Sequence, residues 1–363
     1  MHLEKITLSN YRNVGSASLD FSRGINCIYG SNGAGKTNLI DAVHYLSMTK
    51  SYFSTSDQFI LKYGCDEAIV SGNYIMDDGC TEHIAACIRK GEKCIKRNGK
   101  PYTRFSDHIG LIPIVMVSPS DSALINDSGD GRRRYMNFIL SQIDKLYLSH
   151  IQQYNQLLLR RNRLLRDGCD DTALLDTVTF QMVPHAVYIF DARNRLCEQL
   201  LPVTKSFYRK ISDSAEEISI AYSSQLHKMP FINLMKENEQ KDKVLGYTWA
   251  GIQRDELSFE LDGYPLRKCG SQGQQKTFLL ALKMAQMEFM KGACRTTPIL
   301  LLDDVFDKLD MHRVECLMNV VSTSGFGQIF ITESNKVRIS AIMGSFSAPG
   351  SCFNVEDGIC SVL

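Results

Sequence analysis

The glycine-rich segment at residues 30–37 restricts the possible fold of this chain more than any other feature. It reads Gly-Ser-Asn-Gly-Ala-Gly-Lys-Thr and fits G-x-x-x-x-G-K-[ST] at every required position. The apolar run Ile25–Tyr29 before it predicts a buried strand, and apolar residues from Leu39 to Leu46 recur at helical spacing after it. A strand, a glycine loop and a helix in this order form a phosphate-binding unit. The alternative, a chance glycine-rich turn, does not explain the flanking elements.

Each part of this loop has a physical role in binding a nucleoside triphosphate. The glycines let backbone N–H groups turn toward the phosphates, and the helix N-terminus adds partial positive charge. Lys36 is expected to reach the terminal phosphates and Thr37 to place its hydroxyl on Mg²⁺, so ATP and Mg²⁺ are the expected cofactors. The predicted nucleotide-binding residues of this segment are Gly30, Ser31, Asn32, Gly33, Ala34, Gly35, Lys36, Thr37 and Asn38.

Two adjacent aspartates, Asp303 and Asp304, follow the apolar run Pro298–Leu302. A continuously apolar strand is typical of a buried parallel sheet, and ligands bind at the carboxyl ends of such strands. Asp303 is predicted to hold Mg²⁺, directly or through water. Asp304, leaving the strand on the opposite face, is predicted to orient the attacking water or to accept its proton. A helix-capping turn is the alternative for such a pair alone.

A second candidate anion site is the Ser/Gly/Gln segment from Gly270 to Lys276, ahead of an amphipathic helix predicted from Gln274 to Met290. Its backbone amides and the helix dipole favour an anion. A segment of this composition is often no more than a helix N-cap. Its place upstream of the aspartate strand favours the functional interpretation.

The sequence pattern predicts a split α/β domain with a helical insertion. Short strands are expected between Ala68 and Phe105, with Asn98-Gly99 as a hairpin turn. Residues 132–210 have a helical pattern that breaks at Gly168–Asp171 and is expected to kink at Pro184. Strand-like composition returns at Tyr247–Leu261. The expected domains are an ATPase domain formed by residues 1–120 and 241–363, and an inserted helical arm at 121–240.

Composition narrows the class of protein. Twelve cysteines are scattered without metal-ligand spacing, which indicates a reducing compartment rather than a disulfide framework or zinc site. The start of the chain lacks the pattern of a signal peptide, and no segment is long and apolar enough to cross a bilayer, so we expect a cytoplasmic protein with no membrane partner. The net charge of +1 gives no overall attraction to nucleic acid, so DNA contact requires local basic patches.

Two basic clusters are candidates for such contact, and each is alternatively a solvated face. One lies on the predicted strand layer and the other on the arm. Their members are Arg89, Lys90, Lys93, Lys96, Arg97, Lys100 and Arg104, and Arg160, Arg161, Arg163 and Arg166. Tyr247 and Trp249 are expected in the core rather than as a platform for stacked bases.

These motifs together resemble the ABC-type ATPases of the SMC-like group and, within that group, the RecF family, over essentially the whole chain. Leu8–Asn13 is similar to the Asn-(Phe/Tyr)-Arg-Asn segment that the family carries between its first two strands. Ser118–Asp121 followed by Arg132–Tyr135, and Gly251–Asp255, resemble two longer family segments. The longer segments distinguish the RecF family from its relatives better than the nucleotide motifs do.

The resemblance implies roles for individual residues. Residues 30–37 are the Walker A loop, Asp303 and Asp304 close the Walker B strand, and Leu309-Asp310 is the D-loop. Ser271, Gly273 and Gln274 belong to the signature loop. The expected catalytic residues are Lys36, Asp304 and Ser271, the expected metal ligands are Thr37 and Asp303, and the expected nucleotide contacts beyond the Walker A region are Arg12, Gly273 and Gln274.

The resemblance also implies a mechanism and partners. Two subunits pair head to tail, so that Ser271 and Gly273 face the γ-phosphate held by Lys36 of the partner subunit. ATP favours this dimer and ADP releases it, because a loop rich in backbone donors gains most from the charge of the γ-phosphate. The implied function is an ATP-dependent DNA-binding recombination mediator in repair and replication restart, including gap repair and the SOS response, with weak DNA-stimulated ATPase activity. The implied partners are single-stranded and duplex or gapped DNA, and RecO- and RecR-type proteins.

The chain departs from the family pattern at a few positions. In the segment where the family usually carries Gly-Pro-His-Arg-Asp, this chain has Ile252 and Gln253 at the second and third positions. It has Asn137 where an acid commonly follows the arginines, and Asp307-Lys308 ahead of the D-loop in place of a small residue and an acid. None of these departures removes a phosphate or metal ligand, so we expect ATP binding to be intact.

Three other classes remain as alternatives. The inserted arm with its basic residues counts against a transporter-type ABC subunit that acts on a membrane partner. An SMC-like head that closes DNA loops needs a much longer arm, and a P-loop kinase has no use for a signature loop or a D-loop.

Overall fold

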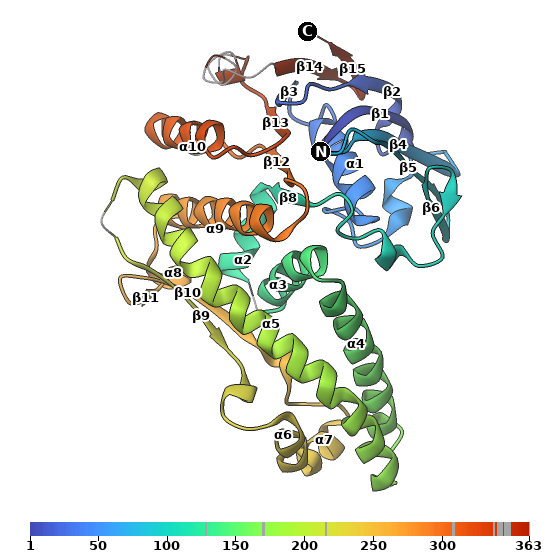
Figure 1. The fold of residues 1–363 in the computed structure, drawn as a ribbon, viewed down its shortest axis with the longest axis vertical. Coiled ribbons are helices and arrows are strands. Elements are labelled where there is room, and N and C mark those ends of the chain that lie inside the picture. Colours follow the sequence, from blue (N-terminus) through green and yellow to red (C-terminus); the bar gives the residue numbers. More distant parts are fainter. Residues whose placement is uncertain are drawn as a thin grey trace. The chain divides into compact units, whose positions relative to one another are not determined.

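The computed structural model describes residues 1–127, 129–168, 171–214, 216–306, 309–336, 338–339, 344 and 350–362, and its ribbon is drawn in Figure 1. Contacts between backbone segments divide the chain into two compact units. The first comprises Met1–Asp121, Lys210–Asp213 and Leu280–Leu363, and the second comprises Ser122–Arg209 and Ser214–Leu279.

A mainly parallel sheet forms the centre of the first unit. Its strands lie in the order β15 (Ile359–Val362), β14 (Gly350–Glu356), β3 (Ile25–Tyr29), β13 (Ile329–Glu333), β12 (Ile299–Asp303) and β8 (Ile114–Val117). All neighbours are parallel except β14 and β15. Every residue of β8, β12 and β13 is buried, which explains why these strands are apolar up to the polar residues that end β12 and β13. The predictions of the strands Ile25–Tyr29 and Ile299–Leu302 are confirmed.

A second, antiparallel sheet belongs to the same unit. Its strands lie in the order β2 (Val14–Asp20), β1 (His2–Tyr11), β4 (Glu67–Ile75), β5 (Thr81–Arg89), β6 (Glu92–Arg97) and β7 (Lys100–Pro101). Buried and exposed residues alternate along β4, as expected for a sheet with one face in the core. Asn98 and Gly99 both have positive φ between β6 and β7, so the predicted hairpin turn is confirmed.

Helix α1 (Lys36–Met48) contacts strands of both sheets, and Figure 1 shows it beside the strands of the antiparallel layer. Its side chains are buried on nearly every face, and the buried set includes the polar residues Lys36, Asp41 and His44 as well as the apolar ones. The carboxyl end of β3 therefore leads directly into a helix held on two sides. Helix α10 (Met311–Thr323) connects the parallel strands β12 and β13.

The second unit is mostly helical. Its helices are α2 (Ala123–Asn126), α3 (Gly129–Ile143), α4 (Lys145–Arg166), most of α5 (Thr172–Ser212), α6 (Phe231–Glu237), α7 (Glu239–Leu245) and α8 (Leu266–Cys269). A small antiparallel sheet has the order β11 (Tyr264–Pro265), β10 (Glu256–Leu261) and β9 (Ile218–Ser223). The helical stretch and its interruption between α4 and α5 are confirmed. Helix α5 is continuous through Pro184, and a kink there stays a prediction.

Two sequence expectations differ from the structure. Residues 247–255 form a loop and a short 3₁₀ turn instead of a strand, because Gly246 and Gly251 have positive φ and the amides of Thr248 and Trp249 bind side chains. The second unit also extends to Leu279, so it contains residues 241–279 that the sequence placed with the ATPase domain. Pairing of β10 with β9 accounts for this extension. Helix α9 (Gln272–Ala293) begins in the second unit and continues in the first.

Candidate nucleotide site

The loop between β3 and α1 encloses a hollow of about 290 Å³. Its lining residues are Asn32, Gly33, Gly35, Lys36, Thr37, Asn38, Asp304 and Thr332. Lys36 Nζ donates hydrogen bonds to the carbonyl oxygens of Gly30 (2.8 Å) and Ser31 (3.0 Å). Gly35 is the N-cap of α1 and provides no side-chain hydrogen bond, so the first N–H groups of the helix face the hollow without a side-chain cap.

Two glycines of this loop are required by close approach of other groups. A Cβ on Gly30 would lie 2.2 Å from the carbonyl oxygen of Val355 in β14. A Cβ on Gly35, where φ is 116°, would lie 2.7 Å from Oδ1 of Asn13. The loop can therefore follow this path only with glycine at these positions.

The structure brings Thr37 and Asp303 together, although 266 positions separate them in the sequence. The Thr37 hydroxyl lies 3.0 Å from Oδ1 and 3.2 Å from Oδ2 of Asp303. Thr332, opposite Asp303 in the neighbouring strand β13, donates to the same Oδ1 at 2.8 Å. Burial raises the pKa of the Asp303 carboxyl, and the hydrogen bonds from Thr332 and Thr37 partly offset this effect.

Asp304 follows β12 in a left-handed conformation with φ of 49°. Its amide donates to the Thr332 hydroxyl at 2.9 Å, and the residue lines the hollow while Asp303 is buried behind it. The two aspartates thus take different positions, as expected, but a backbone turn fixed by Thr332 separates them in place of strand alternation. Thr332 is a residue of this site that the sequence analysis did not identify.

The charges around Lys36 are mostly acidic. Burial lowers the pKa of Lys36, and the nearby Asp304, Asp303 and Glu333 act in the opposite direction. Glu333 ends β13, is buried, and lies 3.5 Å from the guanidinium of Arg338. The sequence signal for Thr332 and Glu333 was the apolar run Ile329–Ile331 ending in polar residues, the pattern that identified Asp303.

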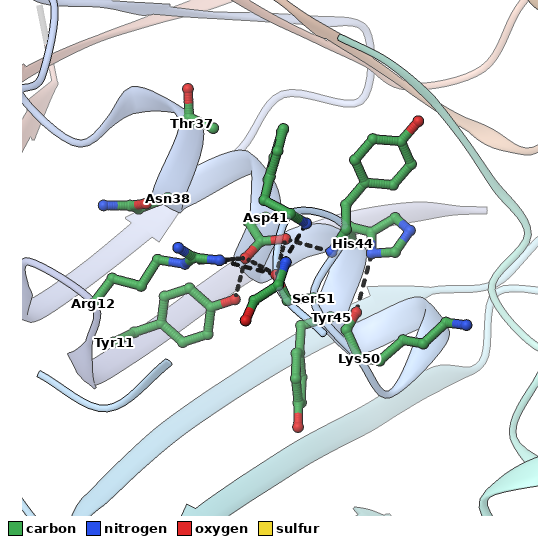
Figure 2. A network of polar contacts seen from close by, with 12 residues as sticks. Tyr11, Arg12, Thr37, Asn38, Asp41, His44, Tyr45, Lys50 and Ser51 are labelled. Atoms are coloured by element: carbon green, nitrogen blue, oxygen red, sulfur yellow. Dashed lines mark hydrogen bonds and ion pairs between the residues drawn. The ribbon is translucent and has the colours of Figure 1, made fainter. Parts of the chain in front are cut away.

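The turn between β1 and β2 supports the glycine loop through Asn13 and α1 through Arg12, and Figure 2 shows the contact of Arg12 with Asp41. Asn13 Nδ2 donates to the Ala34 carbonyl oxygen at 3.0 Å, and Asn38 Nδ2 donates to Asn13 Oδ1 at 2.7 Å. Arg12 is directed toward Asp41 of α1, with its Nη2 atom 3.0 Å from Oδ2. Among the described residues Arg12 does not line the hollow, so its expected contact with nucleotide stays a prediction.

Asp41 is fully buried and collects several donors besides Arg12. The Tyr11 hydroxyl donates to Oδ2 at 2.9 Å, the Ser51 hydroxyl at 2.8 Å, and the Tyr52 amide donates to Oδ1 at 2.8 Å. Figure 2 shows this network together with Thr37 and Asn38 in the first turn of α1. The Asn-Tyr-Arg-Asn segment therefore positions the start of α1.

Three predicted site residues, Ser271, Gly273 and Gln274, lie in the second unit, whereas the others lie in the first. Helix α9 begins at Gln272, earlier than predicted, because Ser271 and Gln274 cap it reciprocally. The Gln274 amide donates to Ser271 Oγ (3.2 Å), and the Ser271 amide donates to Gln274 Oε1 (2.8 Å). Gln274 Nε2 also donates to Glu216 at 2.7 Å. The helix-cap interpretation of this segment thus holds in the single chain.

The departures from the family pattern lie in a buried polar cluster of the second unit. Arg193 Nη1 donates to Asp255 Oδ2 (2.6 Å) and to the Ile252 carbonyl oxygen (2.9 Å), and Nη2 donates to Asn137 Oδ1 (3.1 Å). Gln253 Oε1 accepts from the Tyr154 hydroxyl at 2.5 Å. These residues connect helices to the loop before β10. Asp307 and Lys308 lie outside the described residues.

The structure shows that several members of the two basic clusters are buried or in ion pairs. Arg161 is 2% exposed and paired with Asp242 at 2.7 Å, so its expected contact with DNA is wrong in this conformation. Arg89, Arg97 and Lys93 form ion pairs with Glu67, Glu82 and Asp57. The exposed members outside these pairs are Lys90, Lys96, Lys100, Arg104, Arg160, Arg163 and Arg166. Contact of either cluster with DNA stays a prediction.

The residues present fit a nucleoside triphosphate with a divalent cation. The hollow combines an uncapped helix N-terminus, a lysine and backbone amides, which together favour phosphate. Thr37 and Asp303 offer oxygen ligands, which Mg²⁺ prefers, and a cation beside Asp303 would offset the cost of its buried charge.

The sheet order, the glycine loop and the carboxylates after β12 define an ABC-type ATPase head with a helical second unit, and comparison with known proteins agrees. Smc head domains from Pyrococcus furiosus and Pyrococcus yayanosii share the fold, with TM-scores of 0.60 and 0.62 at 16% and 14% identity, and the chain is covered completely in both comparisons. None of the helices in the described ranges has the length and apolar character needed to cross a membrane.

Sequence comparison identifies the family. Residues 2–347 match the model of the RecF/RecN/SMC N terminal domain. The protein named DNA replication and repair protein RecF from Parabacteroides distasonis is 44% identical, covering 99% of this chain and 98% of its own length. The protein of the same name from Bacteroides thetaiotaomicron is 40% identical, with coverage of 100% and 99%. The chain belongs to the RecF family.

Solved structures lead to the same family. A structure described as the recombination mediator protein RecF with ATP in the RecFOR pathway has a TM-score of 0.89 and 29% identity, covering 100% of this chain and 97% of the solved one. A related RecF–ATPrS structure has a TM-score of 0.88. The predicted fold class and the predicted family are therefore confirmed.

Proposed function

We propose that this protein is an ATP-dependent recombination mediator that acts on DNA during repair and replication restart. ATP binding drives two copies into a head-to-tail dimer on DNA, and slow hydrolysis releases it. The observation that carries the proposal is the contact between Thr37 and Asp303 at the edge of a hollow lined by the glycine loop. Membership of the RecF family adds the repair role.

The residues of this chain divide the work of binding and hydrolysis. The uncapped N-terminus of α1 and the amides of residues 30–37 hold the phosphates, and Lys36 exchanges its hydrogen bonds with Gly30 and Ser31 for phosphate oxygens. Asp304, directed into the hollow, orients the attacking water or accepts its proton. Thr332 holds both aspartates in place through its hydroxyl.

Mg²⁺ would be held by Thr37 and Asp303, and it would neutralise charge on the phosphates when bound. Removal of either oxygen ligand is expected to weaken nucleotide binding in Mg²⁺ while leaving the glycine loop intact. The negative charges of Asp304, Asp303 and Glu333 near Lys36 favour a bound cation beside the phosphates.

In the proposed dimer, each copy contributes residues to the nucleotide site of the other. Ser271 and Gly273 contact the γ-phosphate held by the second copy, after the cap between Ser271 and Gln274 opens. ATP and DNA are the proposed ligands, and RecO- and RecR-type proteins the proposed partners. We place the protein in the cytoplasm.

Sedimentation of the Ser271→Arg variant tests the dimer. The variant is expected to bind ATP as a monomer with unchanged affinity, because Ser271 lies on a segment separate from the glycine loop, and to stay monomeric in a non-hydrolysable ATP analogue. A dimer of unchanged strength in the variant would contradict the head-to-tail arrangement. Titration of the parent with gapped duplex DNA, with and without the analogue, tests the DNA role.

A further inference from the structure

An aromatic and cationic surface lies on α7 and the loop after it, where the sequence analysis expected Tyr247 and Trp249 in the core. Trp249 is 38% exposed, and its ring lies 6.4 Å from that of Tyr247. Lys241 Nζ lies 3.8 Å from the centroid of the Trp249 ring. Arg254 Cζ lies 5.2 Å from the same centroid and 5.8 Å from that of Tyr247. We call these four residues the Trp249 surface.

Buried hydrogen bonds fix the backbone that carries this surface. The Trp249 amide donates to Asp242 Oδ1 at 2.8 Å, and the Thr248 amide donates to Asn162 Oδ1 at 2.8 Å. Arg161 Nη1 donates to both Asp242 Oδ2 and Thr248 Oγ1 at 2.7 Å. Because Arg161, Asp242 and Thr248 are all buried, the loop is held rigidly to α4 and α7. A ring presented in this way needs little ordering to bind a ligand.

Further cations lie on the end of α4, which is close to the loop that carries Trp249. A Cβ on Gly246 would lie 3.8 Å from the Cα of Arg166. Arg163 and Arg166 on this end are exposed, and Arg163 lies 3.7 Å from Asp167 in a long ion pair. Aromatic rings with arginines and lysines around them are typical of surfaces that bind single-stranded nucleic acid.

We propose that the Trp249 surface binds single-stranded DNA by stacking an unpaired base on Trp249, while Arg254, Arg163 and Arg166 contact the phosphates. This inference rests on the DNA role proposed above and specifies the form of DNA and the residues. A single strand fits because its bases are free to stack, whereas the bases of a duplex are covered by their neighbours.

Displacement of the Lys241 ammonium from the Trp249 ring by a stacked base is favourable. An ammonium over an exposed ring contributes less than a stacked base does, and the displaced lysine remains close enough to meet a phosphate. Val244, on α7 with Lys241, is 87% exposed and would suit a protein partner. The cations directly on the ring favour the nucleic acid, and the protein partner is an outcome of the test below.

Trp249 is the single tryptophan of the chain, so its fluorescence reports on this surface alone. The full-length protein is titrated with oligo(dT) of about 16 nucleotides, with an abasic oligomer of equal length, and with the corresponding duplex. Stacking is expected to quench the emission with oligo(dT) only. Trp249→Ala is expected to weaken oligo(dT) binding about tenfold by anisotropy of a labelled oligomer, with Trp249→Phe in between.

Matched measurements separate this inference from the proposed function. Tyr264→Ala removes an exposed ring from β11 and is expected to leave the quenching unchanged. ATP-driven dimerisation of Trp249→Ala is expected to equal that of the parent. Absence of ATP-driven dimerisation in the parent itself would count against the proposed function and not against stacking. Equal affinity for oligo(dT) and the abasic oligomer, no quenching, or no binding of single strands would overturn the inference and leave the surface to a protein partner.

Discussion

The N-termini of α1 and α9 differ in whether their backbone N–H groups are open to a ligand or already capped. Each helix begins after a segment that contains glycine and serine, and each N-terminus concentrates backbone N–H groups and partial positive charge. At α1 the cap is Gly35, which has no side chain, and Lys36 folds back onto carbonyl oxygens. At α9 the chain closes its own helix through the reciprocal bonds of Ser271 and Gln274.

This difference indicates which terminus binds phosphate first. The hollow at α1 offers its donors to a ligand, whereas a phosphate at α9 must replace an existing cap. A single chain is therefore expected to hold ATP at α1, and α9 is expected to engage a nucleotide only when a second copy presents it. Four substitutions test the two halves of this comparison.

The largest effect is expected for Gly30→Ala. The added Cβ meets the Val355 carbonyl oxygen at 2.2 Å, so β14 or the loop must move, at a cost of roughly 3 kcal/mol. Gly33→Ala is the matched control, since no atom of the described residues lies within 4 Å of its Cβ and the positive φ is what opposes the change, at about 1–2 kcal/mol. Thermal unfolding of both variants measures the difference, and equal losses would contradict the close approach.

Lys36→Ala follows in size. Loss of its charge-assisted hydrogen bonds to phosphate is expected to weaken ATP binding by roughly 100-fold, measured by calorimetry. Lys291→Ala removes a lysine of the same unit that donates to the Ser324 carbonyl oxygen, and its ATP affinity is expected to equal that of the parent. Similar affinities for Lys36→Ala and the parent would exclude α1 as the phosphate site.

Ser271→Ala tests the closed terminus. Loss of the cap is expected to destabilise the protein by about 1 kcal/mol without changing the ATP affinity of the single chain. Ser258→Ala, which removes a hydroxyl 3.3 Å from the Ala221 carbonyl oxygen, serves as a control with a smaller loss. Chemical denaturation measures both variants. A fall in single-chain ATP affinity for Ser271→Ala would show that α9 already takes part in binding.

The smallest effect is expected for Asp303→Asn without nucleotide. Burial raises the pKa of Asp303 in the folded protein, so the folded state loses stability as the pH rises from the usual carboxyl range through the raised pKa. The amide carries no charge, and the variant is expected to melt about 2 °C higher than the parent at pH 7. The gain should shrink as the pH falls and vanish below about pH 3, where both the folded and the unfolded parent bind the proton.

The same variant is expected to gain less stability from ATP with Mg²⁺ than the parent does, because it offers a neutral oxygen to the cation. Melting curves with and without the nucleotide give both results. A variant that melts below the parent at pH 7 would show that ionised Asp303 stabilises the fold.

Local sequence patterns predicted the elements of the nucleotide site closely. The apolar run before Gly30 and the helical spacing after Lys36 are properties of short segments, and β3 and α1 have the predicted positions. The strand before Asp303 was equally clear, because a buried parallel strand is apolar at every position. The family resemblance supplied the roles of Ser271, Gly273 and Gln274.

Contacts between distant segments were not predictable in this way. Thr332 and Asn13 act through neighbours that pairing of strands and folding of a turn bring close. Arg161 follows the pattern of an exposed arm residue, but Asp242, 81 positions later, draws it into the interior. Trp249 was expected in the core, and the hydrogen bonds of its loop keep it at the surface.

Mixing two defective variants tests most directly whether α1 of one copy and α9 of another share a nucleotide. Lys36→Ala retains the α9 segment, and Ser271→Arg retains the glycine loop. In a non-hydrolysable ATP analogue, sedimentation should find each variant monomeric alone and a heterodimer in the mixture, with one complete site. Two monomers in the mixture, or a dimer of Ser271→Arg alone, would contradict the shared site.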